Sequence, residues 1–168
     1  MEAKRWPLLI LAGVIIIAGG VFLFKKVTLL HIENMDQPRT IHIRISSSET
    51  FFMFYIHSIY NEPVVEEFQA EEDSIALKGV RTKSPGVMEY YGFEDVKELH
   101  PTDLKLGAIL LLKRGMGEGQ GLIVRDRKIY LSEIGERGNR IQLRVESMSL
   151  GEYFWWSLLK VTQTKSTT

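Results

Sequence analysis

The chain has 168 residues, with 21 basic residues, 21 acidic residues and no cysteine. A domain takes on the order of 100 to 150 residues, so this length accommodates one domain and an anchor. The balanced charge excludes binding to nucleic acid through a broad basic field, and the lack of cysteine excludes disulfides, thiol catalysis and cysteine-ligated metals.

The first element is an apolar segment, Trp6–Phe24, which contains no charged residue and has basic residues on both sides. As a helix rising about 1.5 Å per residue, it nearly matches the roughly 30 Å hydrocarbon thickness of a bilayer. We expect residues 1–26 to be a membrane anchor. A cleaved export signal is the alternative, but the segment ends in Phe22–Phe24 with no small-x-small site. An uncleaved signal anchor predicts a single-pass cell-membrane protein whose bulk is extracytoplasmic.

Residues 27–161 are expected to form this extracytoplasmic domain, which reads as mainly β. Thr40–Ser46 alternates isoleucine with polar residues, which is typical of a half-buried strand, and Phe51–Ile56 is apolar enough for a core strand with neither face in water. Further strands are predicted at 27–32, 64–69, 74–80, 106–113, 122–124, 128–131 and 141–146. Short strands between turns predict a small antiparallel sandwich or barrel.

Two helices are predicted besides the anchor. Phe93–Leu99 places its apolar residues on one face. The Ser-Pro-Gly sequence at 84–86 is expected to break the strand pattern that precedes this helix. Leu150–Val161 is short and rich in aromatic residues. This helix could close the β core, lie at a membrane interface or contact a partner, with Trp155 and Trp156 as the membrane or partner contacts. Residues 162–168 are predicted to be a disordered tail.

The stretch Phe51–Phe68 holds the candidate chemistry. His57 and Ser58 are residue types of a serine hydrolase, with Glu66 nearby. Adjacent residues of a strand point to opposite faces, which places this pair badly for catalysis. We therefore predict no enzyme here. Instead we expect a buried polar cluster in which His57 meets a carboxylate such as Glu66 and fixes strand register.

Two other kinds of site, for a metal and for a phosphate, lack their sequence signatures. His57, Glu66 and His100 lack the spacing of a metal signature, and the glycine-rich loop Arg114–Gly121 lacks the Gly-Lys-Ser/Thr ending of a phosphate-binding loop. No metal and no cofactor are predicted. A remaining alternative is a small-ligand-binding domain of the β-barrel type. Its pocket mouth would be lined by Tyr55, Tyr60, Tyr90 and Tyr91.

A longer pattern runs through the middle of the domain, over residues 51–92. It consists of Tyr55, His57 and Ser58, then Pro63, Val64, Glu66 and Phe68, and later Ser84 and Gly86 in a turn. In this pattern the chain resembles a bacterial and archaeal family of small proteins of unknown function, encoded beside the membrane subunits of TAXI-type TRAP transporters. The family turn carries a second glycine two residues after the first, where this chain has Met88.

The resemblance implies a membrane-anchored accessory or assembly partner of a secondary transporter that takes up organic anions with a separate binding protein. The implied partners are the membrane subunits of the transporter or its substrate-binding protein. This accessory role is the leading hypothesis from the sequence. The alternatives are a small-ligand-binding β domain and, less favoured, an envelope hydrolase that uses His57, Ser58 and Glu66.

Overall fold

The computed structural model describes residues 6–94, 97, 99–115 and 119–164, with the side chains of 7, 8, 18 and 158–164 left out. The chain separates into two compact units. One unit comprises Met1–Val27 and Ser147–Thr168, and the other comprises Thr28–Glu146. The second unit contains nearly all of the β structure and is called the β domain below.

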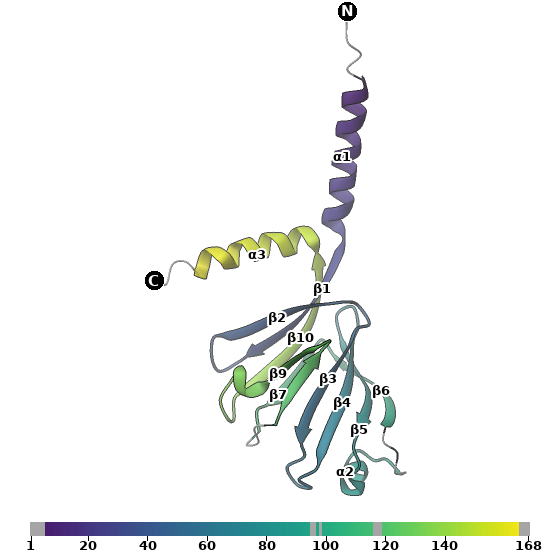
Figure 1. Cartoon of the computed structure of the whole chain (residues 1–168), viewed down its shortest axis with the longest axis vertical. Helices are drawn as coiled ribbons and strands as arrows, with labels where there is room; N and C mark the ends of the chain where they lie inside the picture. Colours follow the sequence, from purple (N-terminus) through teal and green to yellow (C-terminus); the bar gives the residue numbers. More distant parts are fainter. Residues whose placement is uncertain (1–5, 95–96, 98, 116–118, 165–168) are drawn as a thin grey trace, which may run out of the picture. The chain divides into compact units, whose positions relative to one another are not determined.

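The β structure is organised in two antiparallel sheets (Figure 1). The four-stranded sheet has the order β2 (Arg39–Ile45), β1 (Lys26–Asn34), β10 (Arg140–Ser149) and β7 (Ile109–Lys113). The six-stranded sheet has the order β6 (Leu99–Gly107), β5 (Ile75–Arg81), β4 (Pro63–Ala70), β3 (Thr50–Ile56), β8 (Gly121–Val124) and β9 (Arg127–Tyr130). A short 3-10 helix, η1, follows at Leu131–Glu133. The predicted mainly β, sandwich-like fold is confirmed.

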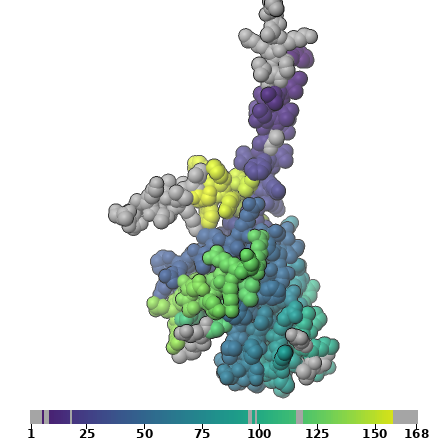
Figure 2. Space-filling view, viewed as in Figure 1, coloured from purple at the N-terminus to yellow at the C-terminus, as the bar shows by residue number. Residues whose placement is uncertain are grey.

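One hydrophobic core joins the two sheets. It contains Leu30 and Ile32 of β1 together with Phe51 of β3 and Phe68 of β4, and all four side chains are buried. The rings of Phe51 and Phe68 stack with centroids 5.4 Å apart. Alternate residues of β3 and β10 are buried against this core, as the period of two requires, whereas β1 and β5 are buried at consecutive positions. Figure 2 shows the blue and green strands of the two sheets as one continuous surface.

The prediction that β3 faces no water on either side is wrong. Phe51 and Met53 are buried, whereas Phe52 and Phe54 on the opposite face are only partly covered and Ile56 is 49% exposed. Phe54 is covered by long side chains of β9, because Lys128 lies over its ring and Tyr130 meets it edge-on. Contacts with such long side chains partly shield the apolar residues on this face of β3 from water.

The helix before β6 lies elsewhere than predicted. Helix α2 spans Pro85–Tyr90, and the Ser84 hydroxyl accepts a hydrogen bond from the Val87 N–H. Serine at the N-cap followed by proline in the first turn is a helix start signal, so the Ser-Pro-Gly sequence begins a helix where a break was expected. Val87 and Met88 are its buried residues.

The predicted helix Phe93–Leu99 is wrong at every position that is described there. Phe93, Glu94 and Lys97 are not helical and Leu99 already belongs to β6, while 95, 96 and 98 lie outside the described residues. The Phe93 ring instead stacks on His100, with centroids 4.2 Å apart. Strand β6 tolerates Pro101 because β6 is an edge strand of its sheet.

The other unit contains two helices. Helix α1 spans Trp6–Phe24 and helix α3 spans Leu150–Thr164. Over the described part of the chain, no helix combines the length and apolarity that crossing a membrane requires. The α3 helix continues past its predicted end, so the prediction of disorder is wrong for 162–164, and 165–168 lie outside the described residues.

Candidate functional site

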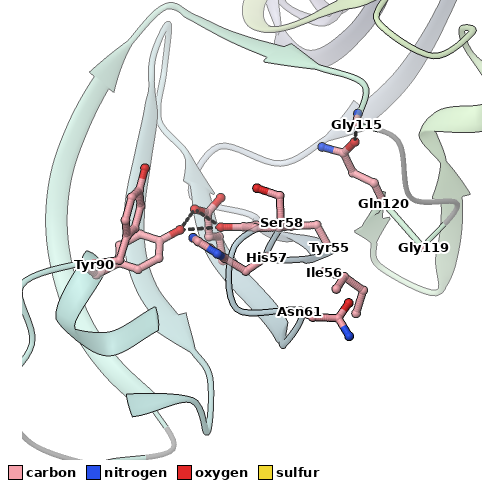
Figure 3. Close-up of a pocket in the computed structure, with 11 residues that line it drawn as sticks. Tyr55, Ile56, His57, Ser58, Asn61, Tyr90, Gly115, Gly119 and Gln120 are labelled. Carbon is pink, nitrogen blue, oxygen red and sulfur yellow. Dashed lines mark hydrogen bonds between the residues drawn. The ribbon is translucent and has the colours of Figure 1, made fainter. Parts of the chain in front are cut away.

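A partly open cavity of about 750 Å³ lies within the β domain, where β3 ends (Figure 3). We call it the tyrosine pocket. Its lining comprises Tyr55, Ile56, His57, Ser58, Asn61, Glu66, Tyr90, Tyr91, Gly115, Gly119 and Gln120. Figure 3 shows Tyr90 and Gln120 on opposite sides, with Tyr55, His57 and Ser58 between them. The volume lies in the range of small-molecule sites, roughly 300 to 1,000 Å³.

The turn between β3 and β4 builds the centre of the pocket. The His57 N–H donates to the Glu62 carbonyl at 2.8 Å, and the Asn61 N–H donates to the His57 carbonyl at 2.8 Å. Asn61 has φ of 52°, a left-handed conformation that asparagine tolerates better than most residues. The turn thereby fixes His57 directly after the last residue of β3, while Pro63 begins β4 opposite Ile56.

Glu66 is the polar exception on the inner face of β4. Val64 and Phe68, two residues to either side, are buried in the core. The Tyr91 hydroxyl donates a hydrogen bond to Glu66 Oε1, and the Tyr55 hydroxyl lies 3.3 Å from the same oxygen. The two hydroxyl oxygens are 2.6 Å apart. Three side chains from β3, β4 and the end of α2 therefore share one hydrogen-bonded cluster.

Burial sets the protonation of this cluster. Burial raises the pKa of Glu66 above its ordinary value, although the hydroxyls of Tyr91 and Tyr55 act in the opposite direction. Burial, followed by the nearby Glu66 carboxylate, raises the pKa of Tyr55 and also the pKa of Tyr91. Both tyrosines thus remain neutral donors at physiological pH, and Glu66 holds its proton more strongly than an exposed glutamate does.

His57 lies beside this cluster with an unused ring nitrogen. Its side chain is only 7% exposed, and its ring contacts the rings of Tyr60 and Tyr90 at centroid distances of 5.2 and 5.0 Å. The buried Nδ1 atom has no hydrogen-bond partner among the described residues. Most buried side-chain polar atoms have a partner in the protein or in ordered water, so this nitrogen requires an explanation.

The predicted cluster residues fall into two groups. Tyr55, His57, Ser58 and Glu66 all line the tyrosine pocket, whereas Pro63, Ser84 and Gly86 support it from outside. The Thr82 hydroxyl donates to the Pro63 carbonyl at 3.3 Å, and Ser84 caps α2. A side chain at Gly86 would overlap the Tyr60 ring, so glycine allows Tyr60 to pack behind His57.

The expected pairing of His57 with Glu66 is not formed. Within the described residues, the hydrogen-bond partners of Glu66 are the tyrosine hydroxyls, and no hydrogen bond joins His57 to Glu66 or to Ser58. The sequence reasoning missed Tyr91 as a partner of Glu66. The neighbouring residues Tyr90 and Tyr91 were the sequence feature that could have indicated this partner. The sequence predicts them only as residues at the mouth of a pocket.

Within the described residues, no group of three histidine or acidic side chains is arranged to hold a metal ion. The glycine-rich loop contributes to the pocket rim through Gly115 and Gln120, where the Gly115 N–H donates to Gln120 Oε1 at 2.9 Å. Residues 116–118, at the centre of this loop, lie outside the described residues.

No family model, no curated protein and no solved structure matches this chain. The residues of the pocket themselves indicate its chemistry. It offers aromatic walls, the partly buried carboxyl group of Glu66, the imidazole of His57 and the polar side chains of Ser58 and Asn61. This mixture of apolar walls with a few convergent polar groups is typical of sites that bind small molecules.

Proposed function

We propose that this protein is a single-pass membrane protein whose β domain binds a small molecule in the tyrosine pocket. The observation that carries the proposal is the cavity of about 750 Å³, whose lining combines three tyrosines, the imidazole of His57 and the carboxyl group of Glu66. Apolar walls with a few convergent polar groups are typical of sites that bind small molecules.

The proposed anchor is α1, with the β domain outside the cytoplasm. Its sequence between Trp6 and Phe24 carries no charge, and its described large apolar side chains are at least half exposed, from Leu23 at 50% to Phe24 at 81%. Exposed apolar surface of this extent marks a membrane or protein contact.

The aromatic helix α3 fits the same proposal. The Leu150 N–H donates to the Lys25 carbonyl at 2.8 Å, so α3 begins directly beside the end of α1. Phe154 and Trp155 are 61% and 66% exposed. Aromatic side chains with a polar edge favour the interface of a bilayer, where α1 would emerge.

A binding role agrees better with the pocket than hydrolysis does. Ser58 is exposed, and among the described residues no hydrogen bond joins it to His57, the base that a serine hydrolase would need. The nearest oxygen cluster is built from the hydroxyls of Tyr55 and Tyr91 and the carboxyl group of Glu66, which suit hydrogen bonding to a ligand.

The ligand site can be tested by blocking it. Ser58→Trp places a large ring at the pocket from an exposed position, and Ser47→Trp is the matched control in the exposed turn before β3. We expect at least one compound in a charge-balanced metabolite library to raise the melting temperature of the full chain in nanodiscs, because a ligand at about 100 times its Kd adds roughly 2.7 kcal/mol. The shift should persist in Ser47→Trp and disappear in Ser58→Trp. A library without any stabilising compound contradicts the proposal.

The second candidate is an accessory role beside a TAXI-type TRAP transporter. It is favoured by the position of the residues that carry the family resemblance, since Tyr55, His57 and Glu66 all line one pocket. In this role the protein would assist a transporter through the pocket. Its partners would be the membrane subunits of that transporter or the substrate-binding protein.

Crosslinking of the full chain in native membranes, followed by mass spectrometry, tests the accessory role. We expect wild type to recover transporter subunits, and a folded His57→Ala, Glu66→Ala double variant to recover fewer of them if the pocket shapes the contact. Recovery of no transporter subunit by wild type under gentle detergent contradicts the accessory role and leaves ligand binding to be judged by the library.

A further inference from the structure

We infer that the molecule bound in the tyrosine pocket is a cation, with a protonated amine or a quaternary ammonium group directed at Glu66. The inference rests on the proposed ligand-binding function and specifies its ligand class. It is argued from the charge of the lining, the partners of Glu66 and the aromatic walls.

The first argument is the charge of the lining. Among the residues that the structure describes around the pocket, Glu66 is the acidic side chain and none is lysine or arginine. A site for a carboxylate or phosphate ligand needs a guanidinium, an ammonium or a group of backbone N–H donors. The lining therefore disfavours an organic anion and leaves a positive or neutral ligand.

The second argument is that Glu66 has no cationic partner among the described residues, whereas other carboxylates there have one. Asp36 lies 2.6 Å from Arg140, and Glu49 lies 2.7 Å from Arg125. Even Glu67, the next residue along β4, meets Arg81 at 3.4 Å. Glu66 is partly buried and, in the described structure, meets only tyrosine hydroxyls. A buried carboxylate is costly unless it is paired, so a ligand cation would supply the missing charge.

The third argument is the aromatic wall. The rings of Tyr55, Tyr90 and Tyr91 line the cavity, and Tyr90 and Tyr91 meet edge-to-face with centroids 5.6 Å apart. Ring faces attract cations, and cages of aromatic side chains bind ammonium groups. His57 adds a further ring to this lining, since its imidazole contacts the rings of Tyr60 and Tyr90 at centroid distances of 5.2 and 5.0 Å. Among the described residues, the titratable groups in contact with Glu66 are Tyr55 from β3 and Tyr91 from the end of α2, and His57 and Tyr90 line the same cavity.

The test compares probes that share a skeleton and differ in charge. Isothermal titration of the full chain in nanodiscs would use benzylamine, benzyl alcohol and benzoate, the corresponding butyl and cyclohexyl compounds, and tetramethylammonium. Glu66→Gln removes the charge of the carboxyl group but keeps an acceptor oxygen. Glu67→Gln is the matched control, because Glu67 is its neighbour on β4 but does not line the pocket.

We expect binding by the amines or by tetramethylammonium, weaker binding by the alcohols and none by the carboxylates. Glu66→Gln should weaken amine binding about 30-fold or more, which is the loss typical when one partner of a buried charge pair is removed. Glu67→Gln should bind within about twofold of wild type.

Two results overturn the inference and leave the ligand-binding function standing. One is that carboxylates or alcohols bind as tightly as the matched amines, and the other is that amine affinity is unchanged in Glu66→Gln. If the cationic probes fail while the metabolite library yields neutral or anionic ligands lost in Ser58→Trp, only the inference fails. If neither the probes nor the library yield a ligand, both proposals fail.

Discussion

Phe68→Ala is expected to lower the free energy of unfolding of the β domain by about 3–5 kcal/mol, the usual cost of removing a buried aromatic ring. Phe68 is 2% exposed and stacks on Phe51 in the core that joins the two sheets. The chain beside it is irregular, because the register of β4 against β5 shifts between Glu67 and Phe68. Because neighbouring core side chains are themselves fixed in strands of both sheets, the cavity left by the ring has little freedom to collapse.

The measurement for Phe68→Ala is denaturant unfolding of the full chain in detergent, followed by circular dichroism. The control is Ile59→Ala in the turn after β3, where the side chain is 73% exposed and a change within about 0.5 kcal/mol is expected. Similar losses for the two variants would show that the core is not organised around the phenylalanine stack.

Glu66→Gln is expected to stabilise the protein at neutral pH and to remove one component of its pH dependence. Burial raises the pKa of Glu66 above the ordinary 4.5, so the folded state binds more protons than the unfolded state between these two pKa values. In that window the contribution of Glu66 to stability falls as pH rises, by at most about 1.4 kcal/mol per pH unit for one proton. Below the unfolded pKa this loss is absent.

The difference between wild type and Glu66→Gln isolates this effect. The glutamine oxygen still accepts from the hydroxyls of Tyr55 and Tyr91, so the hydrogen bonds of the cluster are retained. Asp36 and Glu49, whose pKa values are lowered by hydrogen bonds from Arg140 and Arg125, contribute stability that is lost in acid, but they contribute equally in both proteins. Unfolding midpoints should be measured from about pH 4 to pH 8. The midpoint of Glu66→Gln should exceed that of wild type by an amount that grows as the pH rises. Parallel profiles would contradict a proton held by burial on Glu66.

Most strands could be predicted from the sequence because their patterns are local. The alternation of Ile41, Ile43 and Ile45 and the turns rich in glycine, proline and asparagine are enough to place β2 and its neighbours. The end of β3 and the start of β4 were also recognisable, and the residues chosen there, His57 and Glu66, do line the pocket.

The errors arose where long-range contacts outweigh local pattern. Phe93 and Leu99 share one face of a hypothetical helix, but Phe93 stacks on His100 and Leu99 pairs with Arg81 of β5. The partner of Glu66 was missed for the same reason, since Tyr91 is 25 residues away and only the fold brings its hydroxyl to the carboxyl group. The serine cap and proline of α2 were local signals that the glycine beside them obscured.

The most direct test of the ligand-binding claim is equilibrium dialysis of the full chain in nanodiscs against a bacterial metabolite extract, with retained compounds identified by mass spectrometry. Wild type, Ser58→Trp and Ser47→Trp would be dialysed in parallel. We predict that wild type and Ser47→Trp both enrich a small amine or quaternary ammonium compound that Ser58→Trp does not retain. If no compound is enriched by wild type over Ser58→Trp, the tyrosine pocket is not a ligand site and the central claim is wrong.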